Sequence, residues 1–213
     1  MAVNFDHITT QQNTGTSISA THTLGTRGNR VLFAAVVSNT DPALPKYGGA
    51  GGADFTAIYN SGRYAAGYYI VPAGDSGAKS IYSSYASSDA GMIVAEYYDV
   101  AVIPSGSAGV ATNSYPNTIV PQATSLAIGA IVASLCVNYS STGSSGLTPS
   151  ETSRSGLITV NIGVWCSDTT ATGTTQNMTW TAAGGYGNGM AFAIGFEQLL
   201  GGEPVSVTPY MMA

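Results

Sequence analysis

Residues 17–24 read SISATHTL, and residues 30–38 read RVLFAAVVS. In the first stretch the apolar side chains and His22 share one face while Ser and Thr occupy the other, which predicts a strand with one buried face. The second stretch is apolar without alternation, as in a central strand that is covered on both faces. Turn-forming residues at 25–29 join the two stretches, so this region predicts sheet rather than helix.

Similar strand patterns continue along the whole chain, separated by turns rich in Gly, Pro, Asn and Ser. The predicted strands lie within residues 55–59, 64–71, 80–85, 92–100, 126–139, 158–166, 178–182 and 190–196. We therefore expect an all-β fold, a two-sheet antiparallel β-sandwich of the jelly-roll type, with residues 1–200 as one domain. No internal repeat of fixed period is visible in the sequence.

The composition excludes several classes of protein. Charged residues make up 8% of the 213 residues, against about 25% in ordinary globular proteins. The formal net charge of −5 is opposite to that of a nucleic-acid-binding surface, and 44% hydrophobic residues are too many for a disordered protein. The longest apolar stretch, residues 126–137, is too short to span a bilayer. Neither nucleic acid nor membrane is therefore an expected partner.

Cys136 and Cys166 are either neighbours or, as we expect, separate reduced thiols.

Candidate residues for catalysis or metal binding are few and scattered. Of the 2 histidines, His7 and His22, His22 is expected to be a core residue whose ring bonds a backbone carbonyl or the following turn. A Ser–His–Asp triad is formally available, but no GxSxG motif is present. Glu96 and Glu197 lie in predicted strands, where they either face one another as a glycosidase pair would or, as we expect, point to solvent. The glycine-rich residues 48–52 lack the Lys and the helix of a phosphate loop. No catalytic, cofactor-binding or metal site is predicted.

Aromatic residues and the C-terminus supply the interface candidates. Trp165 alternates with the apolar residues of its strand, so it either packs against a covering layer or is exposed at a subunit interface or a sugar-binding surface. Residues 201–213 read GGEPVSVTPYMMA and predict an extended C-terminal arm. Tyr210, Met211 and Met212 would anchor this arm on a neighbouring subunit, and a frayed terminus is the alternative.

Several short motifs occur in an order that matches a known family. They are Thr21-His22-Thr23, Asn29-Arg30-Val31-Leu32, Tyr47-Gly48-Gly49, Tyr97-Tyr98-Asp99-Val100 and the final apolar strand Ala191–Glu197. In this order they resemble the concanavalin-like jelly-roll family of bacteriophage virion structural proteins, and the resemblance extends from residue 1 to near residue 198. The resemblance implies a two-sheet jelly roll without catalytic residues, because the family has no shared active site.

Together these observations predict a non-enzymatic bacteriophage virion structural protein. The favoured role is a capsid decoration (cement) protein that stabilises the shell through repeated oligomeric contacts. Its expected partners are other copies of itself, in a trimer for example, and the major capsid protein or other virion proteins. The alternative is a tail fibre or spike protein that binds a receptor or a host surface glycan, and a polysaccharide-degrading enzyme is the least favoured interpretation. The N-terminus has no signal-peptide pattern, so assembly in the host cytoplasm and location in the virion are expected.

Overall fold

The computed structural model describes residues 3–86, 89–103, 109–113, 118–139, 147–158, 161–182 and 188–198. Within these ranges the chain forms β-strands and their connections, and the described part contains no helix. Consequently no helix among these residues is long and apolar enough to cross a membrane. The predicted all-β sandwich is confirmed, and the strands pair antiparallel throughout the described ladders.

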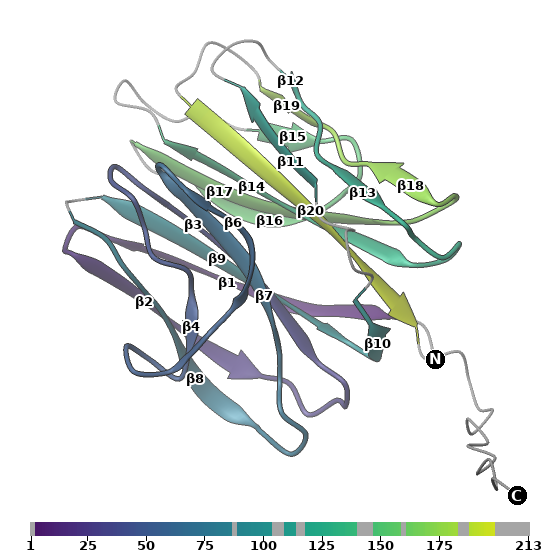
Figure 1. The fold of residues 1–213 in the computed structure, drawn as a ribbon, viewed down its shortest axis with the longest axis horizontal. Helices are drawn as coiled ribbons and strands as arrows, with labels where there is room; N and C mark the ends of the chain where they lie inside the picture. Colours follow the sequence, from purple (N-terminus) through teal and green to yellow (C-terminus); the bar gives the residue numbers. More distant parts are fainter. Residues whose placement is uncertain are drawn as a thin grey trace, which may run out of the picture.

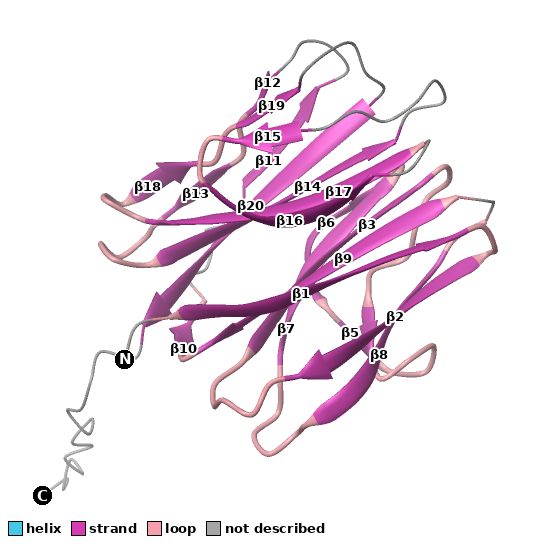
Figure 2. Ribbon diagram, turned by 180° about the vertical axis from the view of Figure 1, so that it is seen from behind, coloured by secondary structure: helices cyan, strands magenta, loops and turns pink. Residues whose placement is uncertain are grey.

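Two inner sheets face each other at the centre of the molecule (Figures 1 and 2). Sheet I has the order β1 (Asn4–Asn13), β9 (Ala90–Tyr98), β3 (Val31–Ser38), β7 (Tyr64–Ile70), β6 (Thr56–Ser61). Sheet II has the order β10 (Val100–Val102), β20 (Asn188–Gln198), β14 (Ile131–Tyr139), β17 (Ile162–Thr170), β16 (Thr152–Ile158), and β11 (Gly109–Asn113) also pairs with β20.

Shorter sheets cover the outer faces of these two. Outer sheet I, on sheet I, has the order β2 (Ser17–Leu24), β8 (Gly77–Ser84), β4 (Lys46–Tyr47), β5 (Ala53–Asp54). The outer strands beside sheet II are β12 (Thr118–Ile119), β19 (Trp180–Ala182) and β15 (Leu147–Pro149) in one sheet, and β13 (Gln122–Thr124) with β18 (Thr175–Asn177) in another. The sandwich expected from the sequence is thus formed by the two inner sheets, and additional outer layers enclose it.

The central core lies between sheets I and II. Phe33 and Ile93 from sheet I meet Leu135 and Phe192 from sheet II in this layer, and all four are fully buried. The sheets approach closely at Gly91, where an added Cβ would lie 2.4 Å from Ile162 Cγ2.

A second core separates sheet I from outer sheet I. Leu32 and Val94 on the outer face of sheet I pack there with Ile18 and Ile81. Strand β3 is therefore buried along its whole length, which confirms the double-sided burial predicted for RVLFAAVVS.

The two halves of the chain have the same topology. The order β1-β9-β3-β7-β6 in sheet I corresponds to β11-β20-β14-β17-β16 in sheet II, and β2-β8-β4 corresponds to β12-β19-β15. Matched pairings lie 100 residues apart: the Val71 amide donates to the Arg30 carbonyl, and the Ala171 amide donates to the Ala130 carbonyl. The strand order is therefore repeated in the two halves, although no repeat is visible in the sequence.

An irregularity in the edge strands supports the same correspondence. The register of β6 against β7 shifts between Ala57 and Tyr59, and that of β16 against β17 shifts between Ser153 and Ser155. Both shifts lie opposite equivalent positions of the partner strand. A bulge conserved in position between two halves indicates a shared local geometry rather than a chance likeness of sheet order.

The last described strand ends at Gln198. Residues 199–213, which include the expected arm and its anchors Tyr210, Met211 and Met212, lie outside the described residues, so the arm stays a prediction.

Candidate functional site

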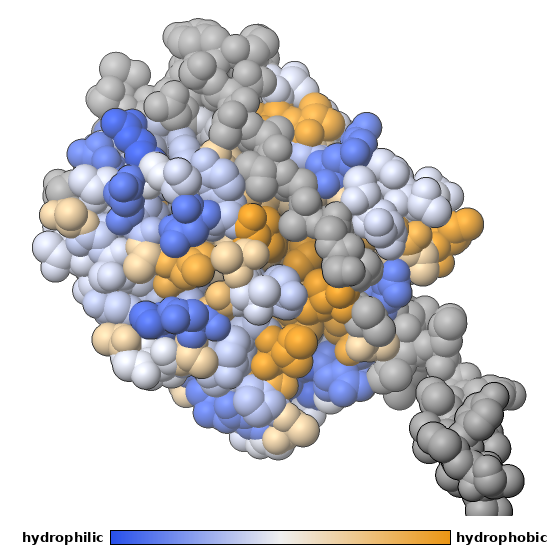
Figure 3. Space-filling view, viewed as in Figure 1, coloured by the Kyte–Doolittle hydropathy of each residue, from blue (hydrophilic) through white to orange (hydrophobic). Residues whose placement is uncertain are grey.

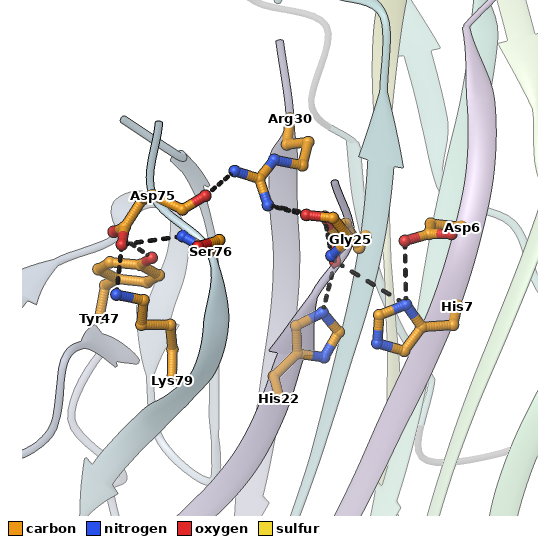
Figure 4. A network of polar contacts seen from close by, with 10 residues as sticks. Asp6, His7, His22, Gly25, Arg30, Tyr47, Asp75, Ser76 and Lys79 are labelled. Atoms are coloured by element: carbon orange, nitrogen blue, oxygen red, sulfur yellow. Dashed lines mark hydrogen bonds and ion pairs between the residues drawn. The ribbon is translucent and has the colours of Figure 1, made fainter. Parts of the chain in front are cut away.

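Both histidines of the chain meet the carboxylate of Glu96. His22 Nε2 lies 3.0 Å from Glu96 Oε2, and His7 Nδ1 lies 3.8 Å from the same oxygen. The two imidazole rings stack with centroids 4.3 Å apart and planes 6° from parallel. Figure 4 shows the rings of His7 and His22 side by side, each on a separate strand.

Strand alternation explains why Glu96 is buried. It follows Met92 and Val94 on the outer face of β9, and both of these residues belong to the core under outer sheet I. Because β9 is an internal strand with both faces covered, a carboxylate on its outer face cannot reach solvent. Glu96 is accordingly fully buried. The expectation that Glu96 points to solvent is therefore wrong.

His22 is a buried core histidine, as predicted, but its partners differ from the expected ones. Its ring bonds Thr9 Oγ1 through Nδ1 at 2.9 Å and Glu96 through Nε2. These partners come from β1 and β9, so both ring nitrogens are engaged by side chains from other strands. A buried imidazole with two polar partners avoids the cost of unsatisfied ring nitrogens.

A bulge in β1 brings two polar side chains to the same region. The register of β1 against β9 shifts between Phe5 and Ile8, and the intervening residues are Asp6 and His7. Neighbouring residues of a regular strand point to opposite faces, whereas here Asp6 Oδ2 lies 3.3 Å from His7 Nδ1. Gly25 leaves room for this carboxylate, because a Cβ at Gly25 would lie 2.4 Å from Asp6 Oδ2.

Arg30 and the Gly25 amide occupy the other side of Glu96. Arg30 is 5% exposed, and its Nη1 lies 3.8 Å from Glu96 Oε1. The Gly25 amide donates to both oxygens of the Glu96 carboxylate, at 3.2 Å from Oε1 and 3.3 Å from Oε2. Arg30 also donates to the carbonyls of Gly25 and Asp75. Apart from this shared amide, the two carboxylate oxygens have different neighbours, because Oε2 faces the histidines and Oε1 faces Arg30.

The same network continues into outer sheet I. The Asp75 carboxylate accepts a hydrogen bond from Tyr47 Oη at 2.6 Å and forms an ion pair with Lys79. The Lys79 hydrogen bond lowers the pKa of Asp75, with the Tyr47 bond acting in the same direction. Burial raises the pKa of Tyr47, and the bond to Asp75 adds to this rise. Figure 4 shows Asp75, Tyr47 and Lys79 on the side of Arg30 that is away from His7.

The electrostatics of Glu96 favour its ionised form. Burial acts to raise its pKa, but the hydrogen bonds from His22 and from the Gly25 amide outweigh burial, and the pKa lies below its ordinary value. A carboxylate that accepts several hydrogen bonds is stabilised as an anion even in an apolar layer. The cluster therefore holds a buried negative charge beside one guanidinium.

A second polar cluster lies in sheet II. Arg154 donates to both carboxylate oxygens of Asp168, at 2.8 Å from Nε and 2.6 Å from Nη2. Tyr97 Oη donates to the same carboxylate at 3.3 Å. Bidentate guanidinium–carboxylate pairs of this kind are directional as well as strong. This cluster links β16 and β17 to β9 across the central core.

The other residues singled out from the sequence lie apart from these clusters. Glu197 Oε1 accepts a hydrogen bond from the Ala127 amide at 3.1 Å, so it does not pair with Glu96. Cys136 and Cys166 are free and buried, and they lie in different core layers. The expectation of separate thiols is therefore confirmed.

Trp165 packs against a covering layer, which is one of the two placements left open by the sequence. It is 7% exposed and shares a core cluster with Leu147 and Trp180. Its indole covers Gly156 and Gly163, since a Cβ at either position would approach the ring to within 2.2 Å and 2.0 Å. Trp165 is therefore a core residue, and its proposal as an interface candidate is wrong.

Comparisons with known proteins assign no family. A scan against family models finds no match, and a search of curated proteins also finds none. Among solved structures, the crystal structure of Cucumber Necrosis Virus aligns with 92% of this chain and 90% of its own chain, at a TM-score of 0.30 and 13% sequence identity. A likeness of this size carries no argument about fold or function.

Proposed function

We propose that this chain is a non-enzymatic structural protein of a bacteriophage virion, and specifically a capsid decoration protein that binds the shell as a homo-oligomer such as a trimer. The observation that carries the proposal is an apolar groove of about 350 Å³ beside β7 and β10. The groove is lined by Asn29, Arg30, Val31, Ile70, Val71, Pro72, Ala73, Val100, Ala101 and Ile103.

Exposed apolar side chains make this groove a candidate for protein contact. Ile70 is 64% exposed although it ends an otherwise well-covered strand. Figure 3 shows hydrophobic surface gathered over the region of β7 and β10. Contiguous apolar surface of this kind on a weakly charged protein is typical of an interaction site.

The occupant that we propose is the C-terminal segment, residues 199–213, of a second copy. Strand β20 ends at Gln198, which pairs with Val100 in the groove wall, so the segment begins beside the groove. Its 15 residues reach about 50 Å when extended, enough to cross to a neighbour, and Tyr210, Met211 and Met212 supply apolar anchors. Reciprocal exchange of such segments closes an oligomer by symmetry.

The rest of the molecule suits a role in assembly. Its low charge leaves few ions to be desolvated when surfaces come together. The buried polar groups of Glu96 and Asp168 link strands of different layers, which favours a rigid unit. Repetition of weak contacts around a shell then yields a high total affinity.

The oligomeric state tests the proposed segment exchange. We expect the full chain to sediment as an oligomer, and both the deletion of residues 201–213 and Ile70→Asp to sediment as monomers. Ile128→Asp is the matched control, because Ile128 is 78% exposed and does not line the groove. Deletion and Ile70→Asp variants that sediment like the full chain would contradict the exchange.

Binding to the shell tests the role itself. Purified protein is mixed with virus shells that lack it, and the bound copies are counted by quantitative mass spectrometry. We expect hundreds of copies per particle, bound to the major capsid protein. A few dozen copies or fewer, confined to tails, would instead support a fibre or spike protein.

A polar pocket favours the second candidate, a receptor- or glycan-binding protein of a tail fibre or spike. The pocket has a volume of about 590 Å³ and is lined by Asp41, Asn60, Ser61 and Tyr85 among others. Carboxylate, amide and hydroxyl groups are suited to hydrogen bonds with sugar hydroxyls. Glycan-array binding that is lost in Asn60→Ala would support this candidate, and no binding would leave the decoration protein ahead.

A further inference from the structure

We propose that His7, His22 and Glu96 bind a divalent transition-metal ion such as Zn²⁺, with the Asp6 carboxylate nearby. This site is independent of the proposed role in the virion. It would be a structural metal site that ties three strands of two different sheets together.

The spacing of the donor atoms fits one ion. His7 Nδ1, His22 Nε2 and a Glu96 carboxylate oxygen lie within 4.8 Å of one another. The two measured separations from Glu96 Oε2 are 3.0 and 3.8 Å. Tetrahedral Zn²⁺ with bonds of about 2.0–2.1 Å holds its ligands roughly 3.3 Å apart. His22 Nε2 and Glu96 Oε2 are thus already close to the distance that a bound ion requires, whereas His7 Nδ1 lies farther from Glu96 Oε2.

The donor set is one that zinc prefers. Two imidazoles with one or two carboxylates form common zinc sites, and the same ligands also suit Co²⁺ and Ni²⁺. Asp6 Oδ2 lies 3.3 Å from His7 Nδ1, so the β1 bulge places a second carboxylate at the edge of the site. Bulges commonly redirect side chains toward a site in this manner.

His22 is held in the orientation of a metal ligand. Thr9 Oγ1 is 2.9 Å from His22 Nδ1. Without metal, Nε2–H donates to Glu96 Oε2. Binding requires the other tautomer, in which Nδ1–H donates to the Thr9 hydroxyl and the lone pair of Nε2 is free for the ion. Metal-binding histidines are typically fixed by such a hydrogen bond at their other ring nitrogen.

His7 must turn to complete the site. An ion lies near the plane of each imidazole that binds it, whereas the two rings here are parallel and 4.3 Å apart. The side chain of His7 is 37% exposed and that of His22 is fully buried. We therefore expect His7 to rotate on binding while His22 remains in place, and the exposed side of His7 provides the route of entry.

The local charge favours a dication. Asp6 and Glu96 carry two negative charges, and Arg30 carries one positive charge near Glu96 Oε1. Arg30 is held by the carbonyls of Gly25 and Asp75, and Glu96 Oε2 faces the histidines. The net charge of −1 attracts a divalent ion, and the oxygen that would bind it is not the one beside the guanidinium.

Metal binding is measured on the full chain, purified without a polyhistidine tag and stripped with EDTA. We expect isothermal titration with ZnCl₂ to give one ion per chain and thermal unfolding to shift to higher temperature in its presence. We expect Co²⁺ to give the intense visible absorption of a tetrahedral site. Absence of Zn²⁺ binding, or binding without the thermal shift, would overturn the proposal.

Variants distinguish this site from adventitious binding. His7→Gln removes the partly exposed ligand, and we expect it to fold and to bind Zn²⁺ at least tenfold more weakly. We expect Thr9→Val to weaken binding by about 10-fold, as loss of an outer hydrogen bond usually does. Asp54→Asn is the control, because Asp54 is an exposed carboxylate paired with Lys46. Equal affinity of wild type and His7→Gln would show that the ion binds elsewhere, and equal weakening by Asp54→Asn would show nonspecific binding.

Discussion

The two halves of the molecule share a strand order but place their charges differently. In the N-terminal half, Arg30 and Glu96 form a buried polar cluster under outer sheet I. The equivalent positions in the C-terminal half are Ala130 and Gly195, by strand pairing. Ala130 belongs to an apolar cluster. The same position between an inner sheet and its outer layer is thus filled by ions in one half and by apolar packing in the other.

At the bulge of the edge strand, the C-terminal half carries the ionic pair and the N-terminal half is apolar. In β16 the bulged residue is Arg154, which binds Asp168 on β17. The equivalent pair in the N-terminal half is Ile58 and Tyr68, and both pack against the central core. The two halves therefore share a strand order although each carries its ionic pair at a position that is apolar in the other.

The largest effect is expected where one half depends on buried ions. Glu96→Leu leaves Arg30 buried without its carboxylate, and removal of one partner of a buried pair costs about 3–5 kcal/mol. The triple variant His22→Leu, Arg30→Met, Glu96→Leu gives this half the apolar character of the other. We expect it to recover most of the loss, as measured by urea unfolding.

The outcome decides between two views of the halves. Recovery in the triple variant would show that the charges are replaceable by apolar packing. A triple variant as unstable as Glu96→Leu would contradict the equivalence of the two halves at this position.

A smaller effect is expected from the ionic pair of the C-terminal half. Asp168→Asn weakens the bidentate bond to Arg154, whose side chain is 33% exposed and can turn toward solvent. Hydrogen bonds to charged groups contribute about 1.5–3 kcal/mol, so we expect a loss in the lower part of this range in chemical denaturation. Asp54→Asn, which breaks the exposed pair with Lys46, is the surface control and should change stability by less than about 1 kcal/mol. Equal losses in both variants would argue against a structural role of the Asp168 cluster.

The smallest effect is expected in the acid pH profile of the N-terminal half. The pKa of Glu96 is lowered in the folded protein from 4.5. Its ionisation therefore stabilises the fold above pH 4.5, and this stability is lost as the pH falls through the folded pKa. In EDTA, the free energy of unfolding of the wild type should fall more steeply below pH 4.5 than that of Glu96→Gln. Parallel profiles would show that Glu96 is not the group concerned.

The buried central strands were predictable because burial leaves a direct trace in the sequence. The edge strands β1 and β16 were not identified, and the strand predicted at 158–166 spans the end of β16 and the start of β17. The run RVLFAAVVS indicated a strand covered on both faces, and the alternation in SISATHTL placed His22 inward. The prediction for Glu96 was wrong because it assumed that a charged side chain points to solvent. Both faces of its strand, β9, are in fact covered by other parts of the protein. The covering of Trp165 could not be decided, because it depends on strands β15 and β19 that are distant in sequence.

The histidine cluster and the repeat were not predictable for related reasons. His22 and Glu96 are 74 residues apart, and the bulge that redirects His7 leaves no pattern in the residues of β1. The repeat is carried by strand order and inward-facing positions, while the residues differ, as with Phe33 and Ala133 or Glu96 and Gly195. Comparison of residue types along the chain therefore does not detect it.

The shared central core makes the single chain equivalent to a dimer whose subunits are covalently joined. In a homodimer every substitution occurs twice, so a buried charge introduced in one subunit must also be accommodated in the other. In a fused chain the substitution occurs once, and the linkage keeps the two inner sheets at a high effective concentration even when one of them is weakened. Each half is thereby free to carry its own cluster, and Glu96 and Asp168 occupy positions that a symmetric pair of subunits would have to duplicate.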